Sequence, residues 1–157
     1  RWSPEPLEDL NSAVSLGAQT VFGNGAEAML VLPGDLGLLT TQDVDDVIVA
    51  SNGLTRAVFS PATRDGGTNA ILAPRGAAFS PLFGPDSFAR HLQAMRLGGS
   101  EVAIVEQPGL GFDLDTPEDL EYYQARRPDL AEALEPLRVE LAASMMSHPE
   151  RDRKERV

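Results

Sequence analysis

Three aspartates stand where carboxylates could hold a divalent cation. Asp35 follows the apolar segment 28–32, and a single residue separates Asp113 from Asp115. Side chains two residues apart in an extended chain point to the same side, so Asp113 and Asp115 can share one ligand. Magnesium suits such a site, because it takes one or two carboxylates together with substrate phosphates and water. The simpler interpretation is that Asp115 and Asp119 lie at the start of a helix and bind no ligand.

Two glycine-containing segments could bind an anion. In Asp65-Gly66-Gly67-Thr68-Asn69 the glycines let backbone N–H groups approach an anion closely, although a Gly-Gly pair is usually only a turn. Phe83-Gly84-Pro85-Asp86-Ser87 opens a predicted helix, whose free N–H groups and Ser87 hydroxyl could hold a carboxylate or phosphate. Ordinary N-capping by Asp86 or Ser87 is the alternative. Arg90 and His91 lie on the next turn, and neither is assigned a role.

The elements that must position these residues follow from apolar spacing and from turn and capping residues. The sequence predicts helices over about 6–22 and 41–51, the second with a capping box at Thr40 and Asp43, a helix with Phe88, Leu92 and Met95 on one face, and a helix with Thr116 at its N-cap and Pro117 as its first residue. It predicts strands over 28–32, 56–60 and 101–106, the first of them buried on both faces. Residues 61–69 are predicted to form a loop, which an apolar run over 70–72 follows. This alternation predicts an α/β sandwich with a largely parallel or mixed sheet, in which ligands gather at the carboxyl ends of strands.

Composition narrows the function classes. The chain has 157 residues, a formal net charge of −11 and no cysteine. Without cysteine there is no disulfide framework, thiolate zinc site, iron–sulfur cluster or cysteine nucleophile. The excess of acidic residues argues against a protein that binds nucleic acid, and no apolar run reaches the roughly 18 residues of a membrane helix. We therefore expect neither nucleic acid nor a membrane as a partner, and we expect a cytoplasmic protein. We expect a single domain over 1–146 and a flexible charged tail over 147–157.

Four stretches together resemble one family. They are Leu30-Val31-Leu32-Pro33-Gly34-Asp35-Leu36, Asp65-Gly66-Gly67-Thr68-Asn69-Ala70, the segment 83–91, and Phe112-Asp113-Leu114-Asp115-Thr116-Pro117-Glu118-Asp119-Leu120. Their order and spacing resemble the 2-phospho-L-lactate guanylyltransferases, the CofC-like family of coenzyme F-420 biosynthesis. The likeness covers about residues 6–125 and includes a Leu10-Asn11 helix. The Phe-Gly-Pro-Asp-Ser stretch with the Gly-Thr-Asn loop is its most specific part.

The resemblance implies a three-layer α/β sandwich of the nucleotide-diphospho-sugar-transferase-like Rossmann type. It implies transfer of GMP from GTP to 2-phospho-L-lactate, or to phosphoenolpyruvate in bacterial relatives, with release of pyrophosphate. Carried over residue by residue, the magnesium ligands would be Asp35, Asp113 and Asp115, and the carboxylate of the three-carbon acid would lie on Thr68, Gly84 and Ser87. Metal ions and positioning supply most of the catalysis in such phosphoryl chemistry.

Family members begin with a strand and a loop of Pro, Lys and Arg that cradles the nucleoside triphosphate. Residues 2–5 do not supply this loop, so we expect the chain to be N-terminally truncated relative to the family. Two alternatives to the guanylyltransferase stay open: a non-catalytic phospho-acid-binding or partner module, and another MobA-like nucleotidyltransferase. The segment 83–87 speaks against the second. The sequence leaves open which phospho-acid and which base are used, and it is compatible with a homodimer.

Overall fold

The computed structural model describes residues 9–114, 117–129 and 132. The chain divides into two compact units, Arg1–Asp115 and Thr116–Val157, and each is described by itself. The second unit contains helix α5 (Pro117–Arg126), which begins at the predicted first residue, Pro117. The predicted N-cap, Thr116, and the predicted tail over 147–157 lie outside the described residues. The single domain over 1–146 stays a prediction. Within the described part of the chain, no helix has the length and apolar character needed to cross a membrane.

The first unit is built on a mixed sheet of four strands. The strands are β1 (Ala28–Val31), β2 (Ala57–Pro61), β3 (Thr68–Pro74) and β4 (Val102–Ile104), in the order β1-β3-β2-β4. Strand β3 is antiparallel to β1 and β2, whereas β2 and β4 are parallel. Strands β1, β2 and β4 therefore run in one direction, and their carboxyl ends reach the edge of the sheet where β3 begins. We call this edge the carboxyl edge.

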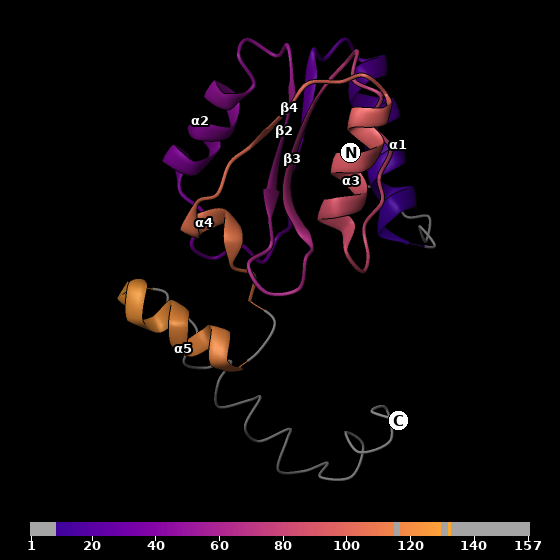
Figure 1. Cartoon of the computed structure of the whole chain (residues 1–157). Coiled ribbons are helices and arrows are strands. Elements are labelled where there is room, and N and C mark those ends of the chain that lie inside the picture. Colours follow the sequence, from indigo (N-terminus) through magenta and orange to yellow (C-terminus); the bar gives the residue numbers. More distant parts are fainter. Residues whose placement is uncertain (1–8, 115–116, 130–131, 133–157) are drawn as a thin grey trace, which may run out of the picture. The chain divides into compact units, whose positions relative to one another are not determined.

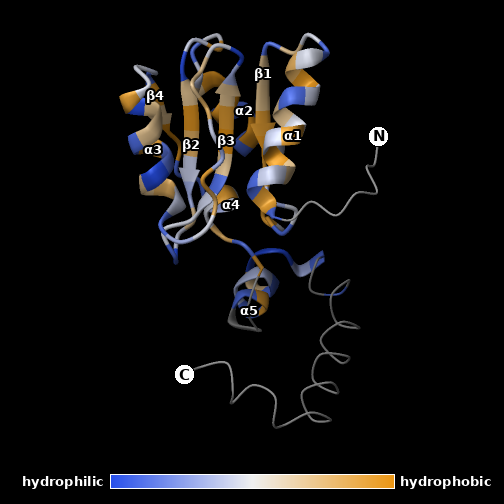
Figure 2. Ribbon diagram, turned by 90° about the vertical axis from the view of Figure 1, so that its right-hand side faces the viewer, coloured by the Kyte–Doolittle hydropathy of each residue, from blue (hydrophilic) through white to orange (hydrophobic). Residues whose placement is uncertain are grey.

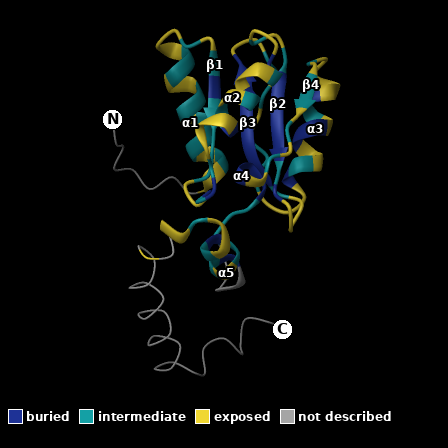
Figure 3. Cartoon of the chain, turned by 90° about the vertical axis from the view of Figure 1, so that its left-hand side faces the viewer, coloured by how far each residue is buried: buried dark blue, intermediate teal, exposed yellow. Residues whose placement is uncertain are grey.

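Helices cover both faces of this sheet (Figure 1). Helices α2 (Thr41–Ala50) and α4 (Pro108–Gly111) lie on one face, and α1 (Leu10–Gly23) and α3 (Ser87–Leu97) lie on the other. The expected three-layer α/β sandwich is confirmed. Hydrophobic residues concentrate in the strands (Figure 2), and β2 and β3 are the most completely buried elements (Figure 3).

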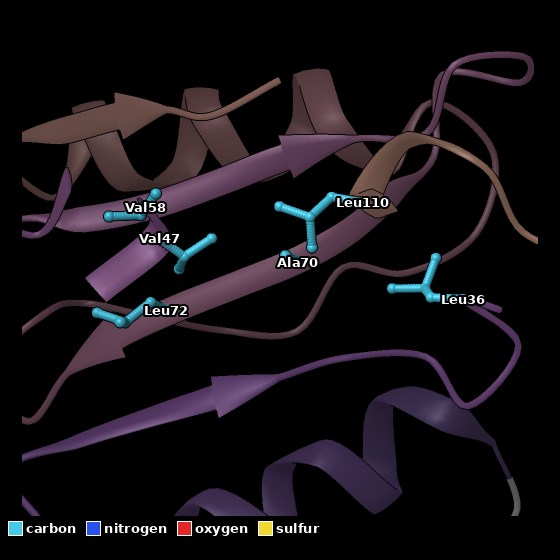
Figure 4. Packing of buried hydrophobic residues seen from close by; sticks show 6 residues of the cluster. All are labelled: Leu36, Val47, Val58, Ala70, Leu72 and Leu110. Atoms are coloured by element: carbon cyan, nitrogen blue, oxygen red, sulfur yellow. The ribbon is translucent and has the colours of Figure 1, made fainter. Parts of the chain in front are cut away.

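Alternation along the central strands divides the apolar core into two clusters, one on each face of the sheet. Val58 pairs with Leu72 and Phe59 pairs with Ile71, so successive pairs point to opposite faces. The cluster under α2 and α4 contains Leu36, Val47, Val58, Ala70, Leu72 and Leu110 (Figure 4). The cluster under α3 contains Ala57, Phe59, Ile71, Ala73, Leu92 and Met95.

Local sequence explains the helix starts. The predicted capping box of α2 is confirmed: the Asp43 N–H donates to Thr40 Oγ1 at 3.2 Å, and the Thr40 N–H donates to Asp43 Oδ2 at 2.8 Å. Helix α1 begins later than residue 6, because Asp9 caps it by accepting the Ser12 N–H at 2.8 Å. Its predicted residues 6–8 lie outside the described residues.

Two strand predictions were wrong. Strand β1 is not buried on both faces: it is an outermost strand of the sheet, and Met29 is the one buried residue among its four. Residues Thr68 and Asn69 were predicted in a loop but begin β3, where both are buried. The edge position of β1 depends on its pairing with the distant strand β3, and the start of β3 depends on its pairing with β2, neither of which local apolar spacing encodes.

Candidate functional site

The loops that carry the predicted acids meet at the carboxyl edge. The Leu114 N–H donates to the Asp35 carbonyl at 3.2 Å, so the segment after β1 lies beside residues 113–114. Asp35 is exposed and Asp113 is half-buried. Helix α4 separates Asp113 from the end of β4, the strand that precedes it in the chain. Asp115 lies outside the described residues, so its place beside the other two acids stays a prediction.

These acids fit a magnesium ion by the chemistry of their donors. Asp35 and Asp113 offer carboxylate oxygens from two adjoining backbone segments, and Mg²⁺ binds in proteins through one or two carboxylates while taking further oxygens from water and substrate phosphates. Among the residues that the structure describes, no group of three or more Asp, Glu, His or Cys side chains is arranged to hold a metal. A site of this kind would therefore depend on substrate oxygens or on Asp115.

The glycine loop between β2 and β3 uses its polar groups internally. The Gly67 N–H donates to Asp65 Oδ1 at 2.8 Å, and the Gly66 carbonyl accepts the Phe88 N–H at 3.1 Å. Gly66 has a positive φ of 72°, and a Cβ there would lie 3.4 Å from Asp86 Oδ1. The expectation that this loop offers free N–H groups to an anion is wrong for Gly67. The loop instead packs against the start of α3.

The start of α3 also differs from both expectations for it. Asp86 is the N-cap residue, but it has a left-handed backbone (φ 53°) and makes no capping hydrogen bond through its side chain. The N–H of Ser87 donates to the Gly84 carbonyl at 3.1 Å, and that of Phe88 is bound to Gly66. These two N–H groups are therefore not available to an anion. Gly84 has a φ of 120°, a conformation that requires glycine.

The Ser87 hydroxyl has a different role from a helix cap. Ser87 Oγ lies 3.1 Å from Thr68 Oγ1, which in turn lies 3.0 Å from His91 Nδ1. Thr68, Ser87 and His91 are exposed by only 5%, 2% and 1%. We call these three residues the hydroxyl cluster. It brings Thr68 and Ser87 together as predicted, with Gly84 joined to Ser87 through the backbone.

A β-bulge aims Thr68 at α3. Strict alternation would place Thr68 on the same face as Ala70 and Leu72, under α2 and α4. The pairing with β2 shifts at this point, since Ser60 pairs with Ala70 but the next residue pairs with Thr68. Asn69 is thus the extra residue, and the bulge turns Thr68 toward the opposite face. Within the described structure, Asn69 Nδ2 and Ser60 Oγ are buried without a hydrogen-bond partner.

His91 is the member of the cluster that sequence reasoning missed. The Leu82 N–H donates to His91 Nε2 at 2.8 Å, and the imidazole packs among Phe59, Phe79 and Phe83. The pKa of His91 is lowered to about 4, mainly by burial and also by the Arg90 charge, against the opposing effect of a backbone hydrogen bond with Ser87. The available signal was its spacing: residues 87 and 91 lie on the same face of a helix.

Helix α1 also contacts the segment before Gly84, through Asn11. Asn11 Nδ2 donates to the Phe83 carbonyl at 3.2 Å, and Asn11 Oδ1 accepts the Phe83 N–H at 2.7 Å. The consecutive N–H groups of Leu82 and Phe83 are therefore bound by side chains of two different helices. This arrangement fixes the backbone that leads to Gly84.

Hollows lie at both ends of the sheet. One of about 450 Å³ lies at the carboxyl edge, between the loop after β2 and the α4 segment, and Phe112 beside Asp113 lines it. A larger one of about 680 Å³ lies at the opposite end, where Arg56 and Glu101 are the charged residues of its lining. Phe112 of the smaller hollow directly precedes Asp113 in the chain, and ligands of such sheets bind at the carboxyl ends of strands, so the carboxyl edge is the candidate site.

Comparison with known proteins identifies the family of this chain. The family model described as "Guanylyl transferase CofC like" matches residues 4–127, a span that includes the acid loops and the hydroxyl cluster. The chain belongs to the CofC-like guanylyltransferase family. Membership covers every residue that the sequence analysis assigned to the site.

Three curated relatives show how this CofC-like chain compares with named proteins. It is 40% identical over 116 residues to the phosphoenolpyruvate guanylyltransferase of Rubrobacter xylanophilus, covering 74% of this chain and 57% of the relative. It is 37% identical over 130 residues to that of Chloroflexus aggregans, covering 81% and 63%. It is 40% identical over 120 residues to the 3-phospho-D-glycerate guanylyltransferase of Phenylobacterium zucineum, covering 74% and 53%. The CofC-like chain thus spans less than two thirds of each of these relatives.

Proposed function

We propose that this chain carries the phospho-acid and metal side of a guanylyltransferase that joins GMP from GTP to phosphoenolpyruvate and releases pyrophosphate. The observation that carries the proposal is the hydroxyl cluster at the carboxyl edge. It combines two buried hydroxyls with the Gly84 turn on the edge where the acid loops meet. A buried pair of polar groups of this kind is costly unless its hydrogen bonds are completed.

The carboxylate of the acid would lie on the cluster. A hydroxyl group of the Thr68–Ser87 pair can donate a hydrogen bond, and a carboxylate accepts it strongly because it is ionised. His91 adds no positive charge, since burial keeps its pKa near 4 and the ring neutral at physiological pH. The site would therefore select the acid by directed hydrogen bonds and by shape.

The phosphate of the acid would face the aspartates. Asp35, Asp113 and Asp115 would hold Mg²⁺, which when bound neutralises charge on the reacting phosphates. A phosphate oxygen of the acid attacks the α-phosphorus of GTP, a new P–O–P bond forms, and the bond from the α-phosphorus to the bridging oxygen of pyrophosphate breaks. Positioning of the two substrates is the contribution of the protein, so no protein nucleophile is required.

Three acids share the required groups. Phosphoenolpyruvate and 3-phospho-D-glycerate, the acids that appear in the names of the relatives, both have a carboxylate and a phosphate ester on a three-carbon chain. The acid of the family resemblance, 2-phospho-L-lactate, also has these groups. We place phosphoenolpyruvate first because two of the three relatives described above have it in their names. The guanylylated product would then enter coenzyme F-420 biosynthesis.

Pyrophosphate release tests the proposal. The full chain is incubated with GTP, Mg²⁺ and each of the three acids in turn, with ATP in place of GTP and EDTA in place of Mg²⁺ as controls. We expect release that requires GTP, the metal and phosphoenolpyruvate. Binding of phosphoenolpyruvate without turnover would support a phospho-acid-binding module instead. Neither binding nor turnover with any of the three acids would overturn the proposal.

A further inference from the structure

The position of the proton on His91 follows from a backbone contact. The Leu82 N–H donates to Nε2 at 2.8 Å, so Nε2 accepts and carries no proton. A neutral imidazole has one N–H, which must then be on Nδ1. Nδ1 lies 3.0 Å from Thr68 Oγ1, and the Nδ1–H therefore donates to Thr68.

Counting hydrogens then sets what the two hydroxyls can do. Thr68 and Ser87 have one hydroxyl hydrogen each, and their 3.1 Å contact uses one of the two, whichever residue donates it. The other hydroxyl hydrogen is not donated to His91, because Nδ1 is already protonated. No other acceptor among the described residues contacts either hydroxyl. One O–H is left to point at a ligand.

We propose that His91 is a positioning residue that makes the Thr68–Ser87 pair a hydrogen-bond donor and so selects a ligand group that only accepts. A carboxylate is such a group, and it has no hydrogen of its own to offer. This inference rests on the proposed function, because it assigns the carboxylate of the phospho-acid to the pair. It adds a residue that touches no substrate but determines the polarity of two that do.

The opposite tautomer would reverse this polarity. With the proton on Nε2, Nδ1 would accept a hydroxyl hydrogen from Thr68, and the second hydrogen would be used between Thr68 and Ser87. The pair would then present only lone pairs to a ligand and would repel a carboxylate. The Leu82 N–H prevents this tautomer, because two donors would face each other at Nε2.

The surroundings hold the imidazole and its partner in place. Three phenylalanine rings lie within about 6 Å of the His91 ring, with centroid distances of 5.1 to 6.1 Å. Asn11 binds both the N–H and the carbonyl of Phe83, the residue after Leu82, so the backbone that presents the Leu82 N–H has little freedom. The donor polarity is thus built into the fold before any ligand binds.

The tautomer can be observed directly in the full chain without substrate. Nitrogen-15 spectra of labelled histidine separate a protonated ring nitrogen from a bare one, and the variant His148→Gln assigns the signals because the chain has two histidines. We expect the proton of His91 on Nδ1 between about pH 5.5 and 8. A proton on Nε2, or a charged ring in this range, would overturn the inference.

A matched pair of variants separates positioning from simple packing. His91→Asn places an amide N–H near the position of Nδ1 and keeps the donor to Thr68, whereas His91→Gln places an amide near Nε2 and keeps a partner for Leu82. We expect the Asn variant to bind phosphoenolpyruvate within about threefold of the native chain and the Gln variant about tenfold more weakly. The reverse order would show that only the Leu82 contact matters and would contradict the inference.

A stability control and a functional control complete the test. Met95→Ala removes a buried side chain of the same helix without touching the hydroxyls, and it should lower the melting temperature while leaving phosphoenolpyruvate affinity within about twofold. An equal loss of affinity in Met95→Ala and His91→Gln would count against a positioning role. If the native chain binds no phospho-acid, the proposed function fails, and the nitrogen-15 spectrum still decides the tautomer by itself.

Discussion

The two halves of the candidate site are built in opposite ways. The hydroxyl cluster is buried, and its side chains are bound to one another and to the backbone of Leu82 before any ligand arrives. The acid loops are joined through the backbone at Leu114 and Asp35, and Asp35 is exposed. The half that we propose as a donor site is buried, whereas the half that we propose for the metal has an acid exposed to water.

This difference follows from the cost of burying each kind of group. Neutral hydroxyls can be buried if their hydrogen bonds are made, so the proposed anion side can be rigid and dry. Ionised carboxylates are far more costly to bury without a counter-charge, so we expect the proposed cation side to stay near the surface. We therefore expect substitutions in the cluster to change affinity through geometry, and substitutions in the acid loops to change the response to metal.

The largest effect should come from the acids. Asp113→Asn should lower the rate of magnesium-dependent guanylyl transfer by about 100-fold, because a metal contributes several kcal/mol of transition-state stabilisation. Thermal unfolding should be almost unchanged, since Asp113 is not in the core. The matched control is Asp45→Asn on the exposed surface of α2. A rate of guanylyl transfer equal to that of the native chain in Asp113→Asn, or an equal loss of rate in the control, would contradict a role of Asp113 in binding the metal.

Ser87→Ala should have the next largest effect. Loss of a hydroxyl that bonds a charged group should weaken phosphoenolpyruvate binding by about 1–3 kcal/mol, measured by calorimetry at constant Mg²⁺. The metal dependence of the remaining binding should not change, which separates this variant from Asp113→Asn. If Ser87→Ala lowers only the melting temperature, the hydroxyl is a structural group and the cluster is not a ligand site.

A pair of glycine variants compares the backbones of the two halves. Gly84→Ala places a side chain at a φ of 120° and should cost on the order of 1–3 kcal/mol of stability, together with affinity for phosphoenolpyruvate. Gly34→Ala, in the acid loop, meets no atom within 4 Å and should cost much less. Urea unfolding of both variants checks this order. Equal costs would show that the two loops are equally constrained.

The smallest effect should be a pH dependence of stability. The pKa of His91 is about 4 in the folded chain and near 6.5 when unfolded, so the unfolded state binds more protons between these values. The contribution of His91 is fully present above about pH 6.5 and is lost as the pH falls toward 4, by less than about 1.4 kcal/mol per pH unit. Urea midpoints across this window should fall more steeply for the native chain than for His91→Asn. Parallel slopes would contradict a buried neutral imidazole.

Local signals in the sequence predicted much of the fold. The capping box at Thr40 and Asp43 located the start of α2 because both of its hydrogen bonds lie within four residues. The three-layer sandwich followed from the alternation of helices and strands. The edge position of β1 was missed, because it depends on its pairing with residues 71–74 of β3, 40 to 46 residues away.

The sequence predicted that Thr68 and Ser87 lie together, but not the contacts that bring them together. Thr68 and Ser87 do meet, yet the bulge at Asn69 that turns Thr68 toward α3 exists only through the pairing of β2 and β3. His91 stayed unassigned because its partners, Leu82 and Thr68, are 9 and 23 residues away along the chain. The occupied N–H group of Phe88 was missed for the same reason, since its acceptor, the Gly66 carbonyl, is 22 residues away along the chain.

A crystal structure of the full chain with phosphoenolpyruvate and Mg²⁺ would test most directly whether the buried hydroxyls bind the acid. The account predicts one carboxylate oxygen within hydrogen-bond distance of Thr68 Oγ1 or Ser87 Oγ, and the phosphate on the side of Asp35 and Asp113. A carboxylate bound at the acid loops, or a ligand in the hollow lined by Arg56 and Glu101 at the other end of the sheet, would contradict it.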